Sequence, residues 1–185
     1  MKLLLLLTLV VIGILVAIKL FVLWYEANFL FYPTRTYDRL PSSIGLEHEI
    51  WTVTAADGVK LRAWWFPGDR ETKPAVLVLH GNGGNIASRL HLAEGFRQLG
   101  WSVCLLDYRG YGESEGAPSE AGINLDGEAA FRRIVEAGFP PERIVLFGES
   151  LGGTVATHLA VTFPAVAGLV LDATLTSAKE MSALI

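Results

Sequence analysis

The sequence predicts an α/β fold, a mostly parallel sheet with helices on both faces, preceded by one transmembrane helix. Apolar runs without polar alternation, such as Ala75–Leu79 and Arg143–Phe147, are typical of strands that are buried on both faces. Helical patterns alternate with these runs, as they do in βαβ units. Glycine-rich loops follow the strand ends, and ligands of such sheets bind beyond the carboxyl ends of the strands. We therefore expect one site at that edge.

Length and composition limit the possible partners. The chain has 185 residues and a formal net charge of −4, which leaves room for one domain with an appendage. No basic stripe stands out, so nucleic acid is not an expected partner. The single cysteine, Cys104, lies in an apolar run and is expected to be a buried thiol, which leaves the redox compartment open.

The N-terminal segment reads as a membrane anchor. Residues 3–25 are apolar apart from Lys19. At about 1.5 Å per residue they would extend roughly 34 Å, enough to cross a hydrocarbon core of about 30 Å. Lys2 followed by leucines also fits a cleaved signal peptide. A retained, single-pass signal anchor over residues 1–25 is preferred, because the stretch is long and no small-residue cleavage site follows it.

The charges on the two sides of this segment favour opposite orientations in the membrane. Lys2 and the terminal amine favour an inside N-terminus and so an extracytoplasmic domain, whereas Lys19, Arg35 and Arg39 compete. Residues 26–45 are expected to be a juxtamembrane segment without regular structure. Residues 46–185 are expected to be the N-terminal part of the α/β domain.

A hairpin opens this domain. Polar and apolar side chains alternate in the second half of residues 47–54 and along residues 59–66, on either side of the turn Ala56-Asp57-Gly58. This predicts an antiparallel pair with one solvated face. Ser119 is placed to cap a helix over residues 119–137. The other elements expected are strands at 75–79, 101–106, 143–147 and 166–172, and helices at 86–99 and 153–160.

The most informative motif is the pentapeptide Gly148-Glu149-Ser150-Leu151-Gly152, which lies between a predicted strand and a predicted helix. In that setting G-x-S-x-G is a nucleophile elbow. Its glycines avoid collisions as strand and helix fold back on each other. The N-terminus of the following helix favours negative charge. The pattern alone arises by chance in roughly one chain in ten to twenty of this length.

Two other glycine-rich loops bear on that interpretation. Residues 80–85 lack the third glycine of G-x-G-x-x-G, and no G-K-[ST] is present, which disfavours a phosphate loop. Two interpretations of residues 80–85 remain: a loop that offers backbone N–H groups to an oxyanion, or a plain turn. In residues 107–114, Ser114 lacks a strand-turn-helix setting and is read as structural.

These motifs, H-G-N-G-G-N at 80–85, D-Y-R-G-Y-G-x-S at 107–114 and G-x-S-L-G-G at 148–153, resemble the α/β-hydrolase superfamily. They are most similar to its membrane-anchored α/β-hydrolase domain-containing proteins. The resemblance implies a serine hydrolase with Ser150 as nucleophile and the N–H groups of Asn82 and Leu151 around the oxyanion. It implies no metal or organic cofactor. It also places these residues at the substrate pocket: His80, which holds the loop, Gly81, Gly83, Glu149 and Tyr108.

The catalytic base is not evident. In this fold the order is Ser, acid, His, yet His158 is the only histidine after Ser150. It lies eight residues along the predicted helix, about 12 Å away and too far to take the serine proton. Asp172 is a candidate acid at a strand end, but the resemblance puts the acid one strand later, beyond Ile185.

The chain is therefore expected to be truncated at its C-terminus, an incomplete fold that leaves the apolar run 166–171 as an open edge. Carboxylic esters or thioesters are the expected substrates, through an acyl-enzyme, and the anchor suggests acyl-lipids or lipidated proteins. Serine at the elbow argues against dehalogenase or epoxide hydrolase chemistry, which needs a carboxylate nucleophile. Two alternatives stay open: a serine peptidase of the same fold, and a catalytically inactive membrane-tethered binding or scaffold protein.

Overall fold

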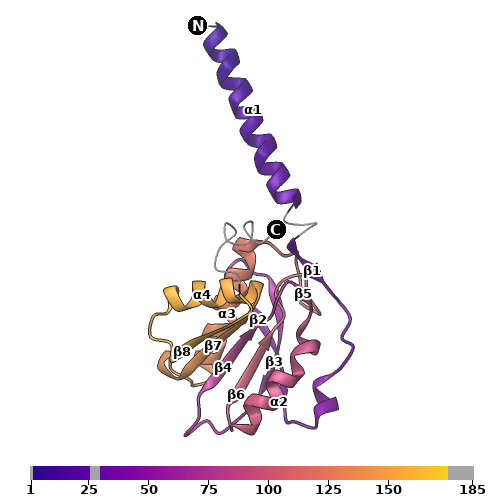
Figure 1. Ribbon diagram of the computed structural model, residues 1–185, viewed down its shortest axis with the longest axis vertical. Helices are drawn as coiled ribbons and strands as arrows, with labels where there is room; N and C mark the ends of the chain where they lie inside the picture. The colour runs from indigo at the N-terminus through magenta and orange to yellow at the C-terminus, as the bar shows by residue number, and fades with distance from the viewer. Residues whose placement is uncertain (1, 26–29, 175–185) are drawn as a thin grey trace. The chain divides into compact units, whose positions relative to one another are not determined.

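The computed structural model describes residues 2–25 and 30–174 and divides into two compact units, residues 1–32 and residues 33–185. In the first unit, α1 (Lys2–Tyr25) is one continuous helix (Figure 1). Its large apolar side chains between Leu7 and Phe21 are 51–61% exposed. The helix expected here is present, but among the described residues no helix is long and apolar enough to span a membrane.

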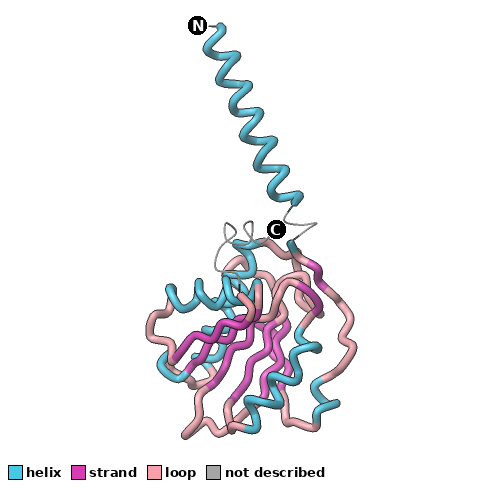
Figure 2. The backbone as a smooth tube through the Cα atoms, in the orientation of Figure 1, coloured by secondary structure: helices cyan, strands magenta, loops and turns pink. Residues whose placement is uncertain are grey.

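The second unit is built on one sheet (Figures 1 and 2). Its strand order is β2-β3-β6-β4-β7-β8. Strands β6, β4, β7 and β8 are parallel, and β3 is antiparallel to both of its neighbours, β2 and β6, which confirms the predicted mostly parallel sheet. The bounds are β2 Glu49–Thr54, β3 Lys60–Phe66, β4 Ala75–Leu79, β6 Ser102–Leu106, β7 Ile144–Glu149 and β8 Gly168–Asp172. Two further strands have two residues each, β1 (Tyr32–Pro33) and β5 (Gly83–Gly84).

The predicted hairpin is present, with Thr54 of β2 opposite Lys60 of β3. A single solvated face was expected for both strands, and this is wrong for β3. Burial alternates along the second half of β2, whereas the last four residues of β3 are all buried. The reason is that both faces of this half of β3 are covered: Trp64 and Phe66 pack in the core layer under α2, and Trp65 packs on the other face against Phe139.

Helices cover both faces of the sheet. Helix α2 (Leu90–Gln98) lies on one face, and α3 (Glu120–Glu136) and α4 (Leu151–Thr162) pack together on the other (Figure 1). Ser119 caps α3 as predicted, since its hydroxyl accepts the Gly122 N–H.

The described part of this unit also contains short 3₁₀ turns: η2 (Pro41–Ile44), η3 (Ile86–Arg89) and η4 (Pro141–Arg143). The helix expected over 86–99 therefore begins as η3, where the Asn85 side chain accepts the Ala87 N–H. The segment 26–45 was expected to lack regular structure. Residues 26–29 lie outside the description, but the rest contains η2, which ends at a left-handed Gly45.

Alternate strand residues divide the core into two layers. One set packs with Ile86, Ala87, Leu90 and Ala93 under α2: Trp64, Phe66, Val76, Val78, Val103, Leu105 and Phe147. The intervening residues point to α3 and α4, and they include Cys104, which is fully buried as predicted. Burial raises the pKa of the Cys104 thiol to about 12.

Strand β8 is the last strand of the described sheet. Its residues Leu169, Val170 and Leu171 are 39–47% exposed. An exposed apolar edge was expected at this run, and it is present in the described part of the chain.

Candidate active site

The glycine-rich loops and the elbow meet at one edge of the sheet. Leu79, the last residue of β4, pairs in register with Leu106 at the end of β6 and with Gly148 near the end of β7. Because these strands are parallel, His80, Asp107 and Ser150 leave the sheet on the same side. The predicted convergence is confirmed.

Ser150 occupies a strained turn between β7 and α4. Its φ of 49° and ψ of −115° lie in a region that non-glycine residues rarely adopt. The Ser150 N–H donates to the Asp172 carbonyl oxygen over 2.8 Å, and the Ser150 carbonyl accepts the Gly153 N–H over 3.0 Å. These two backbone hydrogen bonds hold the conformation from both sides.

The glycines around Ser150 are required sterically. A Cβ on Gly148 would lie 2.5 Å from the Gly153 Cα, and one on Gly152 would overlap the Leu79 carbonyl. Only residues without a side chain fit at these positions, as the sequence predicted. Leu151 is the first residue of α4, so its N–H has no partner within the helix and lies at the positive end of the helix dipole.

The loop after β4 packs directly on the elbow. A Cβ built on Gly81 would lie 3.5 Å from the Ser150 Cβ. His80 Nδ1 lies 2.7 Å from the Gly81 carbonyl oxygen, and a carbonyl only accepts, so Nδ1 carries the proton. The peptide bond is trans, so the Asn82 N–H points away from the imidazole. His80 thus orients the peptide that carries the expected oxyanion donor.

His80 itself is buried beneath this loop. Burial, with the nearby Arg89 guanidinium, lowers the pKa of His80 to about 4, so the imidazole is neutral at neutral pH. Tyr108 is buried as well, and its hydroxyl donates to the His80 carbonyl over 3.3 Å. The structure places both residues behind the loop, while Gly83 and Glu149 are partly exposed.

Two residues that the sequence did not suggest support the same loop. Tyr111 is fully buried, and its hydroxyl donates to the Asn82 carbonyl over 2.6 Å. Arg89 forms an ion pair of 2.9 Å with Glu149, the residue before Ser150. Neither the sequence spacing nor a local pattern connects Arg89 with a residue 60 positions later, so only the folded chain reveals this pair.

The motif D-Y-R-G-Y-G-x-S builds a buried polar network. Asp107 accepts the Ile86 N–H over 2.9 Å and the Tyr37 hydroxyl over 2.7 Å, and burial raises the pKa of Asp107 to about 7. The Ser114 hydroxyl donates to the Asp107 carbonyl and accepts the Arg62 N–H. Ser114 is fully buried, which agrees with its structural interpretation.

No histidine contacts the Ser150 hydroxyl in the described part of the chain. His158 Nε2 lies 3.0 Å from Glu128 Oε1, on the side of α4 that faces α3. His48 and His91 contact the carbonyl oxygens of Leu46 and Ser88. Asp172 reaches Ser150 through its backbone carbonyl.

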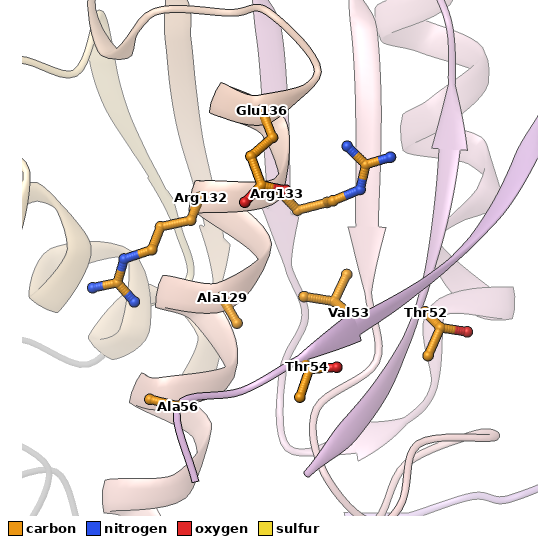
Figure 3. A pocket seen from close by; sticks show the side chains of 8 residues that line it. All are labelled: Thr52, Val53, Thr54, Ala56, Ala129, Arg132, Arg133 and Glu136. Atoms are coloured by element: carbon orange, nitrogen blue, oxygen red, sulfur yellow. The ribbon is translucent and has the colours of Figure 1, made fainter. Parts of the chain in front are cut away.

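A hollow of about 440 Å³ lies elsewhere, between β2 and α3 (Figure 3). Arg132 and Arg133 line it, but their guanidinium groups point in opposite directions (Figure 3). One ion-pairs with Glu128 and the other lies over the Trp51 ring. They do not converge on an anion, and this hollow is not part of the site at Ser150.

The sheet and the strained serine at the turn from β7 to α4 define an α/β protein with a candidate site at the carboxyl edge of its parallel strands. The chain belongs to the alpha/beta hydrolase fold family, which residues 74–184 match. It is similar to an uncharacterised protein of Mycobacterium tuberculosis, at 45% identity over 71% of this chain and 47% of the relative. It is also similar to an uncharacterised membrane protein of Saccharomyces cerevisiae, at 35% identity over 90% of this chain and 61% of that protein.

A third relative is the alpha/beta hydrolase domain-containing protein WAV2 of Arabidopsis thaliana, at 37% identity over 80% of this chain and 50% of that protein. The chain thus spans about half the length of the curated relatives it matches. Among solved structures, a Pyrococcus furiosus esterase matches with a TM-score of 0.66 and 25% identity, over 77% of this chain and 58% of the esterase. An alpha-beta hydrolase of Vibrio vulnificus matches with a TM-score of 0.67 and 26% identity, over 82% of this chain and 54% of the hydrolase.

Proposed function

We propose that the protein is a serine hydrolase that cleaves carboxylic esters or thioesters through an acyl-enzyme at Ser150. One observation carries this proposal: Ser150 is held in a strained turn, with the loop of residues 80–85 on one side and the N-terminus of α4 on the other. The similarity to an esterase of Pyrococcus furiosus supports an ester as the substrate.

In the proposed reaction, the Ser150 hydroxyl oxygen attacks the acyl carbonyl and forms a tetrahedral intermediate. The N–H groups of Asn82 and Leu151 stabilise its oxyanion. The alcohol or thiol then leaves with a proton, and water hydrolyses the acyl-enzyme to release the acid and free Ser150. We propose that a histidine outside these 185 residues takes and returns the proton. The four histidines of this sequence contact other groups: His48, His80 and His91 lie against backbone carbonyl oxygens, and His158 lies against Glu128.

We further propose that residues 1–25 anchor the protein in a membrane, with the second unit on the extracytoplasmic side. The exposed apolar side chains of α1 support this, as does a similar protein of Saccharomyces cerevisiae that is named a membrane protein. An anchor would bring Ser150 near acyl-lipids or lipidated proteins. Release of the protein from membranes by alkaline carbonate, or a mature N-terminus beyond Tyr25, would contradict the proposal, and protease accessibility in sealed vesicles tests the side.

The hydrolase proposal is tested with a fluorophosphonate probe. The probe is applied to the full-length protein, which by this proposal includes the histidine outside these 185 residues. We expect the wild type to be labelled and Ser150→Ala to remain unlabelled. Ser42→Ala, in the exposed part of η2, is the matched control and should label like the wild type. Absence of labelling in the full-length wild type would overturn the proposal and favour an inactive binding protein.

A further inference from the structure

We propose that Arg89 is a positioning residue that sets Ser150 relative to the Asn82 N–H. The inference rests on the proposed function, because it assigns Arg89 a part in the same reaction. Arg89 is the last residue of η3 and lies outside the three motifs at the site. Its guanidinium contacts both segments that carry the reacting groups.

The first contact is with the elbow. Arg89 Nε and Nη2 donate to the two carboxylate oxygens of Glu149, each over 2.9 Å. Two parallel hydrogen bonds between a guanidinium and a carboxylate fix direction as well as distance. Glu149 is the last residue of β7 and is bonded to Ser150, so this pair fixes the side chain that directly precedes the nucleophile.

The second contact is with the loop. Arg89 Nη1 donates to the Gly83 carbonyl over 3.1 Å, and Gly83 directly follows Asn82. The same nitrogen also donates to the Ser88 hydroxyl. One planar group therefore holds a residue next to the nucleophile and a residue next to the expected oxyanion donor.

The two segments are close enough for such a link to matter. A Cβ on Gly81 would lie 3.6 Å from Arg89 Nη2 and 3.5 Å from the Ser150 Cβ. The guanidinium thus lies at the junction between the loop and the elbow. A displacement of about 1 Å between reacting groups can slow a reaction about 100-fold, so a loosened junction is expected to show in the rate.

Burial and charge keep the link intact at neutral pH. The Arg89 side chain is 12% exposed, and that of Glu149 is 31% exposed. Hydrogen bonds from Arg89 lower the pKa of Glu149, so the carboxylate stays ionised. A lysine would keep the charge, but it lacks the planar fork and cannot form the two parallel hydrogen bonds to the Glu149 carboxylate. Arg89→Lys therefore separates geometry from charge.

The test measures fluorophosphonate labelling of Ser150 in the full-length protein, giving a maximal rate and a half-saturating probe concentration. We expect Arg89→Met and Arg89→Lys to lower the maximal rate about 10- to 100-fold, with the half-saturating concentration unchanged within about twofold. Glu149→Gln should also lower it, because an amide cannot accept both hydrogen bonds. Arg132→Met removes the exposed pair with Glu128, remote from the site, and should leave the rate unchanged.

The outcomes separate the inference from the function on which it rests. An unlabelled wild type refutes the proposed function, and with it the role of Arg89. A labelled wild type with Arg89→Lys reacting at the same rate refutes only the inference. So does a loss that disappears once the rate is corrected for the folded fraction, because Arg89 would then be structural. If Arg89→Met does not fold, the labelling rates of Arg89→Lys and Glu149→Gln decide whether Arg89 positions Ser150.

Discussion

The backbone N–H of Ser150 donates a hydrogen bond of 2.8 Å to the backbone carbonyl of Asp172. Glu149 and Asp172 are register partners, so the end of β8 lies directly beside the start of the elbow. The strained conformation of Ser150 thus depends on a neighbouring strand as well as on its own glycines. Asp172 was considered from the sequence as a catalytic acid, and the contact that the structure gives it with Ser150 is made by its backbone.

Gly152→Ala is expected to destabilise the fold and disturb the elbow. The added methyl group would overlap the Leu79 carbonyl, so α4 or β4 has to shift. Overpacking of this kind costs about 1–3 kcal/mol in the free energy of unfolding, measured by urea denaturation. Gly95→Ala is the control: its Cβ would meet nothing within 4 Å in α2, so a gain of about 0.5–1 kcal/mol is expected. Equal effects at both positions would contradict the steric explanation.

Tyr111→Phe tests the support beneath the loop of residues 80–85. The substitution removes the hydroxyl that donates to the Asn82 carbonyl and leaves the ring in place. We expect a loss of about 1–2 kcal/mol in the free energy of unfolding, and slower fluorophosphonate labelling of the full-length protein. Tyr32→Phe, at an exposed tyrosine, should change stability by less than about 0.5 kcal/mol. Unchanged stability and labelling in Tyr111→Phe would show that the hydrogen bond does not hold the loop.

Asp107 is expected to make stability depend on pH. Burial raises its pKa from 3.8 to about 7 in the folded state. Between these values the folded state binds the proton and the unfolded state does not, so stability from this group falls as pH rises. It is fully present below about pH 3.8 and lost once the pH passes about 7.

Urea unfolding of the wild type and Asp107→Asn at pH values from about 5 to 8 measures this effect. Relative to the variant, the wild type should lose up to about 1.4 kcal/mol per pH unit on the way to pH 7 and then level off. Using the difference removes contributions from the other carboxylates. A difference that does not vary with pH would mean that Asp107 ionises at its ordinary pKa.

The buried pair of Arg109 and Asp126 is expected to be sensitive to loss of one partner. Asp126 is fully buried and accepts from the Arg109 guanidinium over 2.8 Å and from its backbone N–H over 2.8 Å. Asp126→Ala should cost about 1–3 kcal/mol, because the Arg109 guanidinium loses its buried partner and keeps only its ion pair with Asp57. The double variant Arg109→Met/Asp126→Leu should cost less than the sum of its single changes in urea unfolding. Additive losses would contradict this coupling.

Much of the site could be predicted because its parts are local. The apolar runs, the turn residues and the glycines of the elbow lie next to one another in the sequence. Parallel strands have their carboxyl ends at one edge of the sheet, so the alternation of strands and helices predicted that His80, Asp107 and Ser150 share that edge. Only the fold shows that their strands, β4, β6 and β7, are neighbours. The glycines at 148 and 152 were assigned correctly for the same reason, since an elbow makes the same steric demand in any sheet.

The features that the sequence predicted wrongly or did not indicate depend on contacts that only folding creates. The strand β3 was expected to have a solvated face, and packing against the α2 layer on one side and Phe139 on the other buries it instead. Arg89, Tyr37 and Tyr111 carry no local sign of their partners, which lie between 29 and 70 positions away.

By itself, the sequence determined the α/β class, the strand-to-helix setting of Ser150 and the edge of the sheet at which a site would form. These depend on side-chain periodicity and on the steric freedom of glycine, which neighbouring residues decide. The tertiary structure alone decided that Arg89 links Glu149 to Gly83 and that Asp172 holds the Ser150 backbone. Such contacts depend on strand order and on how elements pack, which no short stretch of sequence specifies.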